Sequence, residues 1–336
     1  MWNNRKITKV SQLKKTEIED LLIIKDLFVE YRTLEGIVYA VNGMNFNIKK
    51  GDALALVGET GAGKTTTALS ILKLLPQQGF ITKGQIIFDN QNLLKMNKKE
   101  ILNIRGNHIS MIFQDPMSSL NPVFTVAHQI AETIKVHNKQ LKWKVVYQQV
   151  NEMLRSVGIS VDRANEFPHE FSGGMIQRVM IAIALVCRPR LLIADEPTTA
   201  LDVTVQAQIV ELMKELKQKF NTSLIFITHN LGIVPELCKY VAVMYAGKIM
   251  EIGTIEEIYS KPIHPYSKAL FNCIPDVKKP DKKLFPIPGL SPSPKLILKG
   301  CPFYDRCSEA KRYCKSNIPE TKKISKSHYI ACFKNV

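Results

Sequence analysis

The length, composition and charge of the sequence exclude several classes of protein. The chain has 336 residues, of which 45% are hydrophobic and 23% charged, and it is not cysteine-dense, so it has the composition of an ordinary soluble protein. Its longest apolar run, at 180–187, is too short to cross a bilayer. The net charge of +16 is compatible with nucleic acid or with an anionic membrane surface and selects neither.

Residues 1–20 are expected to form a flexible lead-in, because they are polar and lack the apolar core of a signal peptide. We therefore expect a cytoplasmic chain, for which a partner would supply any membrane segment. Two strand-like runs follow at 21–31 and 36–50, where β-branched and aromatic residues occur in partial alternation.

The next elements predict an α/β fold. ALALV at 53–57 is short and continuously apolar, as expected of a strand buried on both faces, and the helical stretch after it ends at Pro76. RLLIADE at 190–196 and TSLIFITH at 222–229 are two more such strands, and an amphipathic helix at 203–220 lies between them. Strand, helix and strand in this order imply a parallel sheet that is covered on both sides.

Three other segments depart from this pattern. Residues 116–171 read as helices, and we assign them to an inserted helical subdomain. A hairpin is expected at 241–253. After Pro262 the composition changes to proline, lysine and cysteine, so residues 261–336 are expected to form a separate C-terminal extension.

A glycine-rich segment between the first buried strand and its helix fits a phosphate-binding loop. GETGAGKT at 58–65 matches G-x-x-x-x-G-K-[ST] in the strand–loop–helix context that the mechanism needs. Glycines let backbone N–H groups point at phosphate oxygens, and the helix start adds a positive dipole end. We expect Lys64 to neutralise charge on the phosphates and Thr65 to ligate Mg²⁺. The residues expected to bind ATP in this segment are Gly58, Glu59, Thr60, Gly61, Ala62, Gly63, Lys64, Thr65 and Thr66.

An acidic pair, Asp195 and Glu196, follows the buried strand in RLLIADEP. Ligands of α/β sheets bind at the carboxyl ends of the strands, which is where these side chains should lie. Asp195 would hold Mg²⁺ directly or through water, and Glu196 would orient the attacking water. Such a pair is more often a helix cap or a solvated edge, but its combination with a phosphate loop favours catalysis.

A third motif, FSGGMIQR at 171–178, identifies the family. With the two motifs above, the sequence resembles the ATP-binding subunits of ABC transporters. Other landmarks stand in the family's order: Gln114 in MIFQDP, Asp202 in ALD, and His229 in ITHN. The resemblance covers about 21–260 and implies an ABC nucleotide-binding domain with a RecA-like P-loop core, an antiparallel β subdomain and the helical subdomain.

The resemblance also implies roles for residues outside the phosphate loop. The helix start at SGG presents N–H groups to an anion. In the family it faces the ATP bound by a second subunit of a head-to-tail dimer, and Asp202 links the two sites. Gln114 would join Thr65 and Asp195 on Mg²⁺ and report the nucleotide state to the membrane subunits, while His229 would contact the γ-phosphate. The residues implied to act across the dimer are Ser172, Gly173, Gly174 and Gln177.

One aromatic residue and one departure from the family pattern complete the nucleotide motifs. Tyr31 matches the family's adenine-stacking aromatic, with an ordinary strand tyrosine as the alternative. Met175 stands after SGG where most members have glutamine, and methionine cannot donate a hydrogen bond. The same variant is found in one of the two ATPase subunits of peptide permeases. We therefore expect a heterodimer with a related, non-identical ATPase.

Four cysteines in the tail form a candidate metal site: Cys301, Cys307, Cys314 and Cys332. Disulfides are not expected in a reducing cytoplasm. Structural zinc usually binds pairs two to four residues apart, and no pair here is that close, whereas iron–sulfur clusters accept wider spacing. His328 is a further candidate ligand, although a surface position is expected for it.

Three tail segments resemble the C-terminal extension of peptide-permease ATPases: HPYSKAL at 264–270, PGLSPSP at 288–294 and CPFYDRC at 301–307. That resemblance implies import of di- or oligopeptides, with nickel or another small solute as the alternative cargo. It implies a [4Fe–4S] cluster, with Zn²⁺ as the alternative. It also implies two integral membrane permease subunits, a second ATPase subunit and an extracytoplasmic substrate-binding protein, and a peripheral position at the cytoplasmic face of the membrane.

Two other functions compete with transport. A soluble ABC ATPase acting on nucleic acid would suit the basic charge, but the sequence contains neither the long coiled coils nor the second module of such proteins. A nucleotide-binding regulator without activity would lack catalytic residues, yet Lys64, Asp195, Glu196 and His229 are all present. We therefore expect an ATPase that drives transport, and no nucleic-acid partner.

Overall fold

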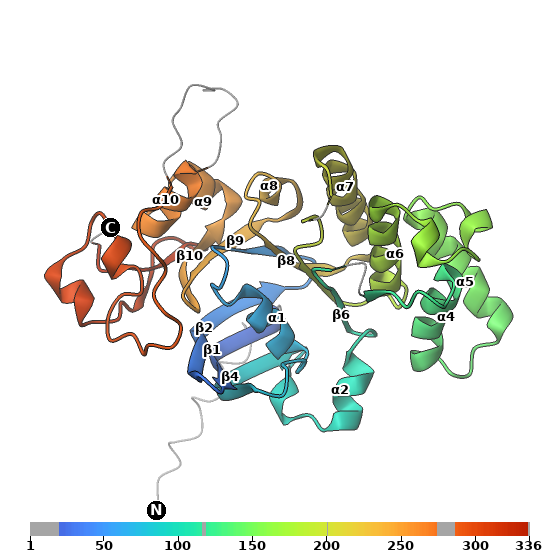
Figure 1. Ribbon diagram of the computed structural model, residues 1–336, viewed down its shortest axis with the longest axis horizontal. Coiled ribbons are helices and arrows are strands. Elements are labelled where there is room, and N and C mark those ends of the chain that lie inside the picture. The colour runs from blue at the N-terminus through green and yellow to red at the C-terminus, as the bar shows by residue number, and fades with distance from the viewer. Residues whose placement is uncertain (1–19, 116–118, 200, 274–285, 335–336) are drawn as a thin grey trace, which may run out of the picture.

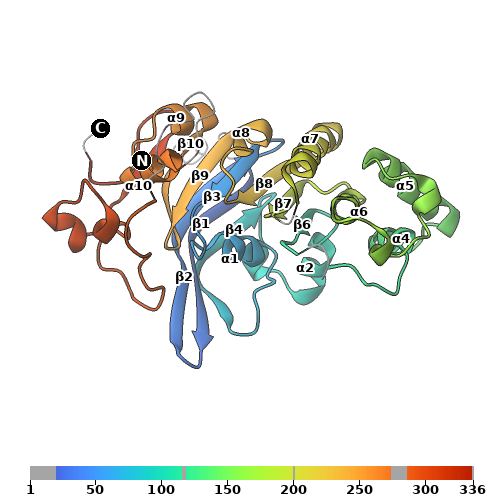
Figure 2. The ribbon, with the colours of Figure 1, turned by 45° about the horizontal axis from the view of Figure 1, so that its top comes forward.

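A computed structural model describes residues 20–115, 119–199, 201–273 and 286–334. Two sheets form the middle of the elongated molecule (Figure 1), and the helices α4 (Val126–His137) and α5 (Trp143–Ser156) lie at one end. The C-terminal segment lies at the opposite end in both ribbon views (Figures 1 and 2). The expected flexible lead-in lies outside the described residues except for Asp20, which begins the first strand.

Within the described ranges, the larger sheet has the strand order β11-β12-β10-β9-β3-β8-β7-β6. β3, β6, β7, β8 and β9 are mutually parallel, whereas β10, β11 and β12 pair antiparallel. The parallel sheet confirms the α/β class that the apolar runs predict. The bounds of these strands are β3 (Ala53–Val57), β6 (Ile109–Ile112), β7 (Leu191–Asp195), β8 (Ser223–Thr228), β9 (Tyr240–Tyr245), β10 (Lys248–Thr254), β11 (Thr321–Lys323) and β12 (Tyr329–Ala331).

Strand β3 shows why the central strands are apolar throughout. Alternate side chains of a strand point to opposite faces of its sheet. Ala53, Ala55 and Val57 therefore pack in one core with the helices α4 to α9. Leu54 and Leu56 pack on the other side with α1 (Lys64–Ile71) and the smaller sheet. Both faces are covered, so every position of β3 is buried.

The smaller sheet is antiparallel, which confirms the β subdomain that the family resemblance implies. Its strand order is β2-β1-β4-β5, and β1 forms long ladders with both β2 and β4. The short helix α2 (Lys98–Ile104) follows this sheet in the chain and begins with a capping box at Asn97. The strands are β1 (Asp20–Thr33), β2 (Gly36–Lys49), β4 (Gly79–Phe88) and β5 (Gln91–Asn92).

The segment expected to be helical contains the helices α4 and α5, which turns connect; its first residues, 116–118, lie outside the described ranges. On α5 the buried residues Val146, Val150, Met153 and Leu154 recur at spacings of three and four, which gives the helix one apolar face. The segment also contains η2 (Val161–Arg163) and η3 (Pro168–Glu170). Two helices follow it in the chain: α6 (Gly173–Leu185), directly after it, and α7 (Val203–Phe220), after β7.

Residues beyond 261 continue the central sheet. β12 pairs with β10 through Glu251–Ile330 and Ile252–Tyr329, and β11 pairs with β12. The extension is therefore joined to the nucleotide-binding core by backbone pairing, which its composition did not indicate. The remaining elements are η1 (Leu93–Lys95), α8 (Val234–Leu237), α9 (Ile255–Ser260), α10 (Pro265–Asn272), η4 (Tyr304–Arg306) and η5 (Arg312–Lys315). None of the helices in the described ranges is both long and apolar enough to cross a membrane.

Candidate active site

The phosphate loop connects β3 to α1 and depends on glycine at three positions. Gly58, Gly61 and Gly63 have φ values of 151°, 80° and 96°, a region that other residues rarely adopt. A Cβ atom on Gly58 would lie 2.1 Å from the carbonyl oxygen of Met244. The loop can therefore curl against β9 only with glycine at its start.

Lys64 opens α1 and lies under the loop. Its side chain is nearly buried, and Nζ donates to the carbonyl oxygens of Gly58 and Glu59 at 2.8 and 3.1 Å. Burial lowers the pKa of Lys64, against the opposing charges of Glu196 and Asp195. The ammonium group thus lies where a triphosphate would meet the loop.

Asp195 ends β7 and contacts the other end of the loop. Its carboxylate is buried, and the nearby Thr65 hydroxyl acts to lower its pKa. Burial raises the pKa of Asp195, and the charge of Glu196 adds to the effect. Among the described residues, Oδ1 of Asp195 has no hydrogen-bond partner. An orphaned carboxylate oxygen beside a threonine hydroxyl is the donor set that Mg²⁺ prefers, so these residues fit the expected ion.

Glu196 is the centre of the site. Its Oε2 atom lies 3.1 Å from Gln114 Nε2, 3.0 Å from Thr199 Oγ1 and 3.3 Å from His229 Nδ1. Its backbone has a φ of 48°, unusual for glutamate, and its N–H donates to Ile227. Strain of this kind is often found at functional sites. Three elements far apart in the sequence therefore meet at one carboxylate oxygen.

Gln114 lies in the same site. Its amide nitrogen donates to Glu196, and its role as a Mg²⁺ ligand stays a prediction. Thr199 was missed by the sequence analysis. It lies three residues after Glu196, and its hydroxyl also reaches the Glu196 carbonyl, a local turn contact that serine and threonine often make.

Tyr31 lies beside the start of α1. Its hydroxyl is 3.1 Å from Oγ1 of Thr66, and the side chain is partly buried. The position next to the phosphate loop agrees with a residue that contacts nucleotide. Its stacking on adenine stays a prediction.

The motif at 171–178 divides into a surface part and a core part. Ser172 and Gly173 are exposed at the start of α6, and the Ser172 side chain makes no capping bond there. Gln177 is 0% exposed, because it lies one turn further on, where α6 faces the core. This burial corrects the expectation that its side chain acts across the dimer. Met175 is partly buried, and its sulfur accepts a contact of 3.0 Å from Arg163 Nη1.

Gly174 and Asp202 both lie where α6 meets the start of α7. A Cβ atom on Gly174 would lie 2.6 Å from a methyl group of Val205, so glycine allows close packing there. Asp202 caps α7, because its Oδ1 accepts from the N–H groups of Thr204 and Val205. Ala200, in the same ALD motif, lies outside the described residues.

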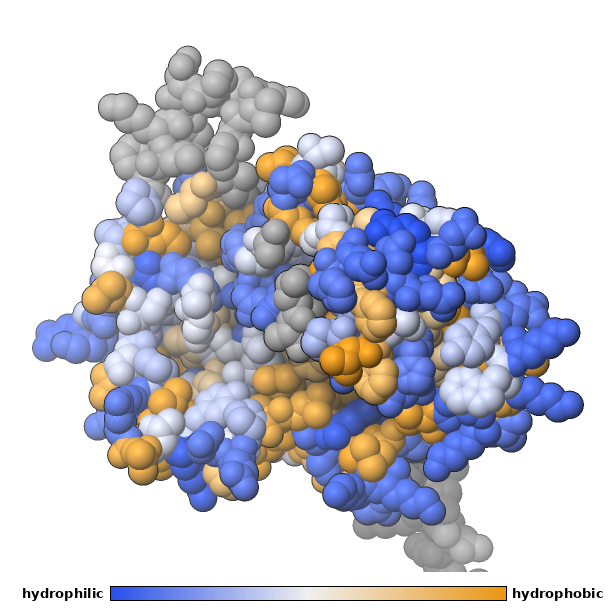
Figure 3. All heavy atoms as spheres, turned by 45° about the vertical axis from the view of Figure 1, so that its right-hand side comes forward, coloured by the Kyte–Doolittle hydropathy of each residue, from blue (hydrophilic) through white to orange (hydrophobic). Residues whose placement is uncertain are grey.

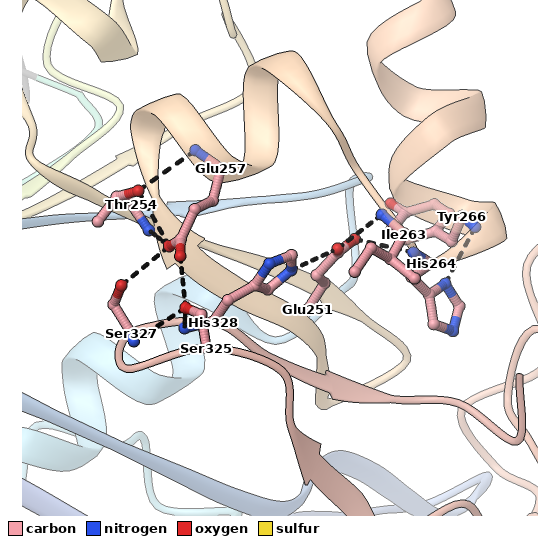
Figure 4. A network of polar contacts seen from close by, with 9 residues as sticks. All are labelled: Glu251, Thr254, Glu257, Ile263, His264, Tyr266, Ser325, Ser327 and His328. Carbon is pink, nitrogen blue, oxygen red and sulfur yellow. Dashed lines mark hydrogen bonds and ion pairs between the residues drawn. The ribbon is translucent and has the colours of Figure 1, made fainter. Parts of the chain in front are cut away.

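A network of polar contacts fixes the C-terminal extension to β10 (Figure 4). Glu251 is 0% exposed and accepts from the N–H groups of Ile263 and His264 at 2.8 and 3.1 Å. Its carboxylate also lies 2.8 Å from Nε2 of His328. His328 is therefore a buried partner of Glu251, which corrects both its expected surface position and its candidacy as a metal ligand.

A second carboxylate strengthens the same junction. Glu257 on α9 accepts from the Ser325 and Ser327 hydroxyl groups and from Thr254 (Figure 4). Burial alone would raise the pKa of Glu257, but these hydrogen bonds outweigh it and hold the pKa at about 2. The strand β12 is thus fastened to β10 and α9 by charge and by backbone pairing.

The four tail cysteines lie in one region and are all partly buried. The Cys301 N–H donates to the Cys314 carbonyl at 2.8 Å. Burial raises the pKa of Cys301 to about 11, and the charges of Cys332, Cys307 and Cys314 add to the effect. Across the described ranges, however, no three His, Cys, Asp or Glu side chains are close enough to hold a metal ion. The chemistry of four neighbouring thiols fits a metal centre, but in this structure the thiols are not close enough together to form one.

Sequence comparisons find relatives along most of the chain. Residues 41–199 match the family described as ABC transporter, and residues 250–314 match the oligopeptide/dipeptide transporter C-terminal region. The oligopeptide transport ATP-binding protein OppD of Bacillus subtilis is 48% identical over 92% of this chain and 87% of its own. The dipeptide transport ATP-binding protein DppD of the same organism is 46% identical over 94% and 95%.

Solved structures share the fold. The ATP-binding cassette MJ0796, solved in a post-hydrolysis state bound to ADP and phosphate, has a TM-score of 0.63 and is 26% identical. It aligns over 70% of this chain and 98% of its own. The cbiO1 protein of Clostridium perfringens, part of the ABC transporter complex cbiONQ, also has a TM-score of 0.63, is 30% identical, and aligns over 72% of this chain and 92% of its own.

Proposed function

Because the chain belongs to the family of ABC transporter ATP-binding proteins of the oligopeptide/dipeptide type, we propose that it drives uptake of di- and oligopeptides by hydrolysing ATP. The observation that carries the ATPase is the meeting of Gln114, Thr199 and His229 at Glu196, next to Lys64. The names of the relatives and the match at 250–314 support the peptide cargo.

The residues of the site divide the work of hydrolysis. Backbone N–H groups of the phosphate loop and Lys64 bind the phosphates of ATP. Mg²⁺, held by Thr65 and Asp195, would neutralise charge that develops on them. Glu196 orients the attacking water, and Gln114 and His229 hold Glu196 in position while they lie close to the γ-phosphate.

A reconstituted complex tests the cargo directly. ATP turnover in the presence of the substrate-binding protein should rise on addition of di- or oligopeptides and should not respond to Ni²⁺ or to single amino acids. Stimulation by Ni²⁺ alone would instead identify a nickel importer of the same family and overturn the peptide assignment.

We propose that the chain is organised in two parts. Residues 21–260 form the nucleotide-binding domain, with the helical subdomain at about 116–171, and residues 261–336 form the extension. The domain works at the cytoplasmic face of the membrane with two permease subunits and a substrate-binding protein, and it uses no nucleic acid.

Three exposed apolar side chains within ten residues of Gln114 in the sequence support docking on the membrane subunits. They are Phe113, Val123 and Phe124, which are 40%, 70% and 41% exposed. The end of the molecule that Figure 3 turns forward is largely hydrophilic, with hydrophobic atoms gathered around a hollow. Apolar groups of this kind, rimmed by polar ones, often mark protein interfaces.

Met175 supports a heterodimer. Its thioether accepts from Arg163 and has no proton to donate, so it offers a partner's ATP no side-chain hydrogen bond. A second ATPase with an intact motif would complete the site on this chain. The mixture of both chains should hydrolyse ATP faster than either one, and an equal rate for this chain alone would contradict the pairing.

We also propose that Cys301, Cys307, Cys314 and Cys332 hold a [4Fe–4S] cluster with a structural role. Their partial burial and the repulsion among their thiolates support this. Both disfavour the thiolate form, and a cationic centre would offset both effects. Protein purified without oxygen should be brown, with iron and acid-labile sulfide in equal amounts. Colourless protein that holds zinc would identify Zn²⁺ as the occupant.

A further inference from the structure

The phosphate loop contains an acidic residue whose charge opposes its function. Glu59 is the second residue of GETGAGKT, where ATP would bring several negative charges. A free carboxylate at this position would repel the phosphates. The structure does not leave Glu59 free.

The C-terminal extension neutralises this carboxylate. Arg306 binds it in a fork, with Nη1 2.8 Å from Oε2 and Nη2 3.0 Å from Oε1. The hydroxyl of Ser291 donates to Oε2 at 2.8 Å. Burial alone would raise the pKa of Glu59, but the hydrogen bonds from Arg306 and Ser291 outweigh it and keep the pKa below its usual value.

Several contacts besides the one to Glu59 hold the Arg306 side chain in place. Its side chain is 6% exposed, Nε donates to the Pro288 carbonyl at 3.0 Å, and Nη1 also reaches the Tyr245 hydroxyl at 3.1 Å. The guanidinium lies over the Tyr245 ring, 5.6 Å from its centroid. A planar fork fixed in this way loses little freedom when it binds a carboxylate.

The segment that carries Ser291 is itself fastened to the core. The Tyr39 N–H on β2 donates to the Pro294 carbonyl at 2.7 Å. A cavity between the loop and this segment is lined by residues 59–62 and 291–294. The extension therefore borders residues 59–62 of the phosphate loop.

The backbone of Glu59 contacts Lys64, the lysine that is expected to bind ATP. Its carbonyl accepts from Lys64 Nζ at 3.1 Å, and its N–H donates to the Tyr266 hydroxyl at 3.1 Å. One residue thus joins the extension, α10 and Lys64. A shift of the Glu59 side chain would move the backbone on which Lys64 depends.

We propose that Arg306 is a positioning residue for the phosphate loop: by binding Glu59 it cancels a repulsive charge and fixes the loop in the shape that receives ATP. The proposal rests on the proposed ATPase function and adds a second part of the chain to ATP recognition. Arg306 acts on ATP through Glu59 and without touching it.

Binding of a fluorescent ATP analogue with Mg²⁺ to the full chain tests this. Arg306→Ala should weaken binding about tenfold, since a charge-assisted fork is lost and a carboxylate is left near the phosphates. The affinity of Arg306→Lys should lie between those of the wild type and Arg306→Ala, because an ammonium group keeps the charge but cannot form the two-pronged contact. Arg312→Ala, which removes the same charge from an exposed position of the extension, is the control and should bind like the wild type.

A double variant separates positioning from folding of the extension. Glu59→Gln removes the charge that Arg306 cancels, so adding Arg306→Ala to it should cost no more than about twofold in affinity. In the assembled transporter, Arg306→Ala should raise KM for ATP and leave kcat within about twofold.

Three outcomes would overturn the proposal: wild-type affinity for Arg306→Ala, an undiminished loss in the Glu59→Gln background, or a fall of kcat at constant KM. Failure of the wild-type chain to bind ATP would instead contradict the proposed function.

Discussion

Two carboxylates of this protein each receive three polar contacts, and their surroundings differ. Glu196 lies at the carboxyl edge of the parallel sheet, 15% exposed, and its neighbours at Oε2 are three side chains. Glu251 lies on β10, 0% exposed, and two of its neighbours are backbone N–H groups. The sealed carboxylate can only fasten the chain, whereas the open one can act on a ligand. Accessibility and the kind of donor separate a catalytic carboxylate from a structural one.

The comparison predicts that loss of the sealed carboxylate strongly destabilises the protein. Glu251→Ala should lower the free energy of unfolding by about 3–5 kcal/mol, because it leaves His328 and two backbone N–H groups buried without their partner. Urea denaturation measures this. Glu256→Ala, an exposed neighbour on α9, should change stability by less than about 0.5 kcal/mol. A loss below about 1 kcal/mol for Glu251→Ala would show that the network does not hold the extension on β10.

Acid should loosen the same junction through His264. Burial lowers the pKa of His264 to about 3, while the unfolded chain protonates this group near 6.5. Between these two pH values the unfolded state binds more protons, so stability falls as the pH falls, by up to about 1.4 kcal/mol per pH unit. His264→Asn keeps an acceptor for the Tyr266 N–H and does not titrate, so its stability should depend less on pH.

Denaturation curves from pH 7 to pH 4 test this effect. His169→Asn is the matched control, since His169 is exposed, and it should keep the wild-type slope. An unchanged slope in His264→Asn would mean that other groups set the acid sensitivity.

The smallest expected effect concerns the open carboxylate. Thr199→Val removes one of the three contacts that orient Glu196, so kcat should fall about tenfold, the equivalent of one hydrogen bond, and KM for ATP should not change. Thr204→Val, on an exposed turn of α7, should leave both constants alone. A higher KM at constant kcat would assign Thr199 to ATP binding instead of to catalysis.

Local motifs made much of the fold and site predictable. The phosphate loop around 58–65 and the acidic pair at the end of β7 each have a geometry that adjacent residues determine. Glycines shape the turn, and a strand carries the residues at its end to the edge of the sheet. Gln114, Glu196 and His229 are far apart in the sequence, and only the family resemblance indicated that they belong to one site.

Contacts between distant segments were not predictable. Arg306 and Glu59 are 247 positions apart, and Glu251 and His328 are 77 apart, with no periodic pattern to relate them. Gln177 was misplaced for a different reason: the motif gave its sequence position, whereas the face of α6 on which it lies depends on packing. His328 was misjudged because its buried partner is on another strand of the sheet.

ATP binding and ATP turnover, measured on the same samples of wild type and Glu196→Gln within the assembled transporter, test the central claim most directly. The geometry predicts that the variant retains ATP with affinity close to that of the wild type and loses about a hundredfold or more in turnover, because only the group that orients water has changed. Glu215→Gln, an exposed substitution on α7, should behave like the wild type in both. Undiminished turnover by Glu196→Gln would contradict the assignment of this carboxylate as the catalytic centre.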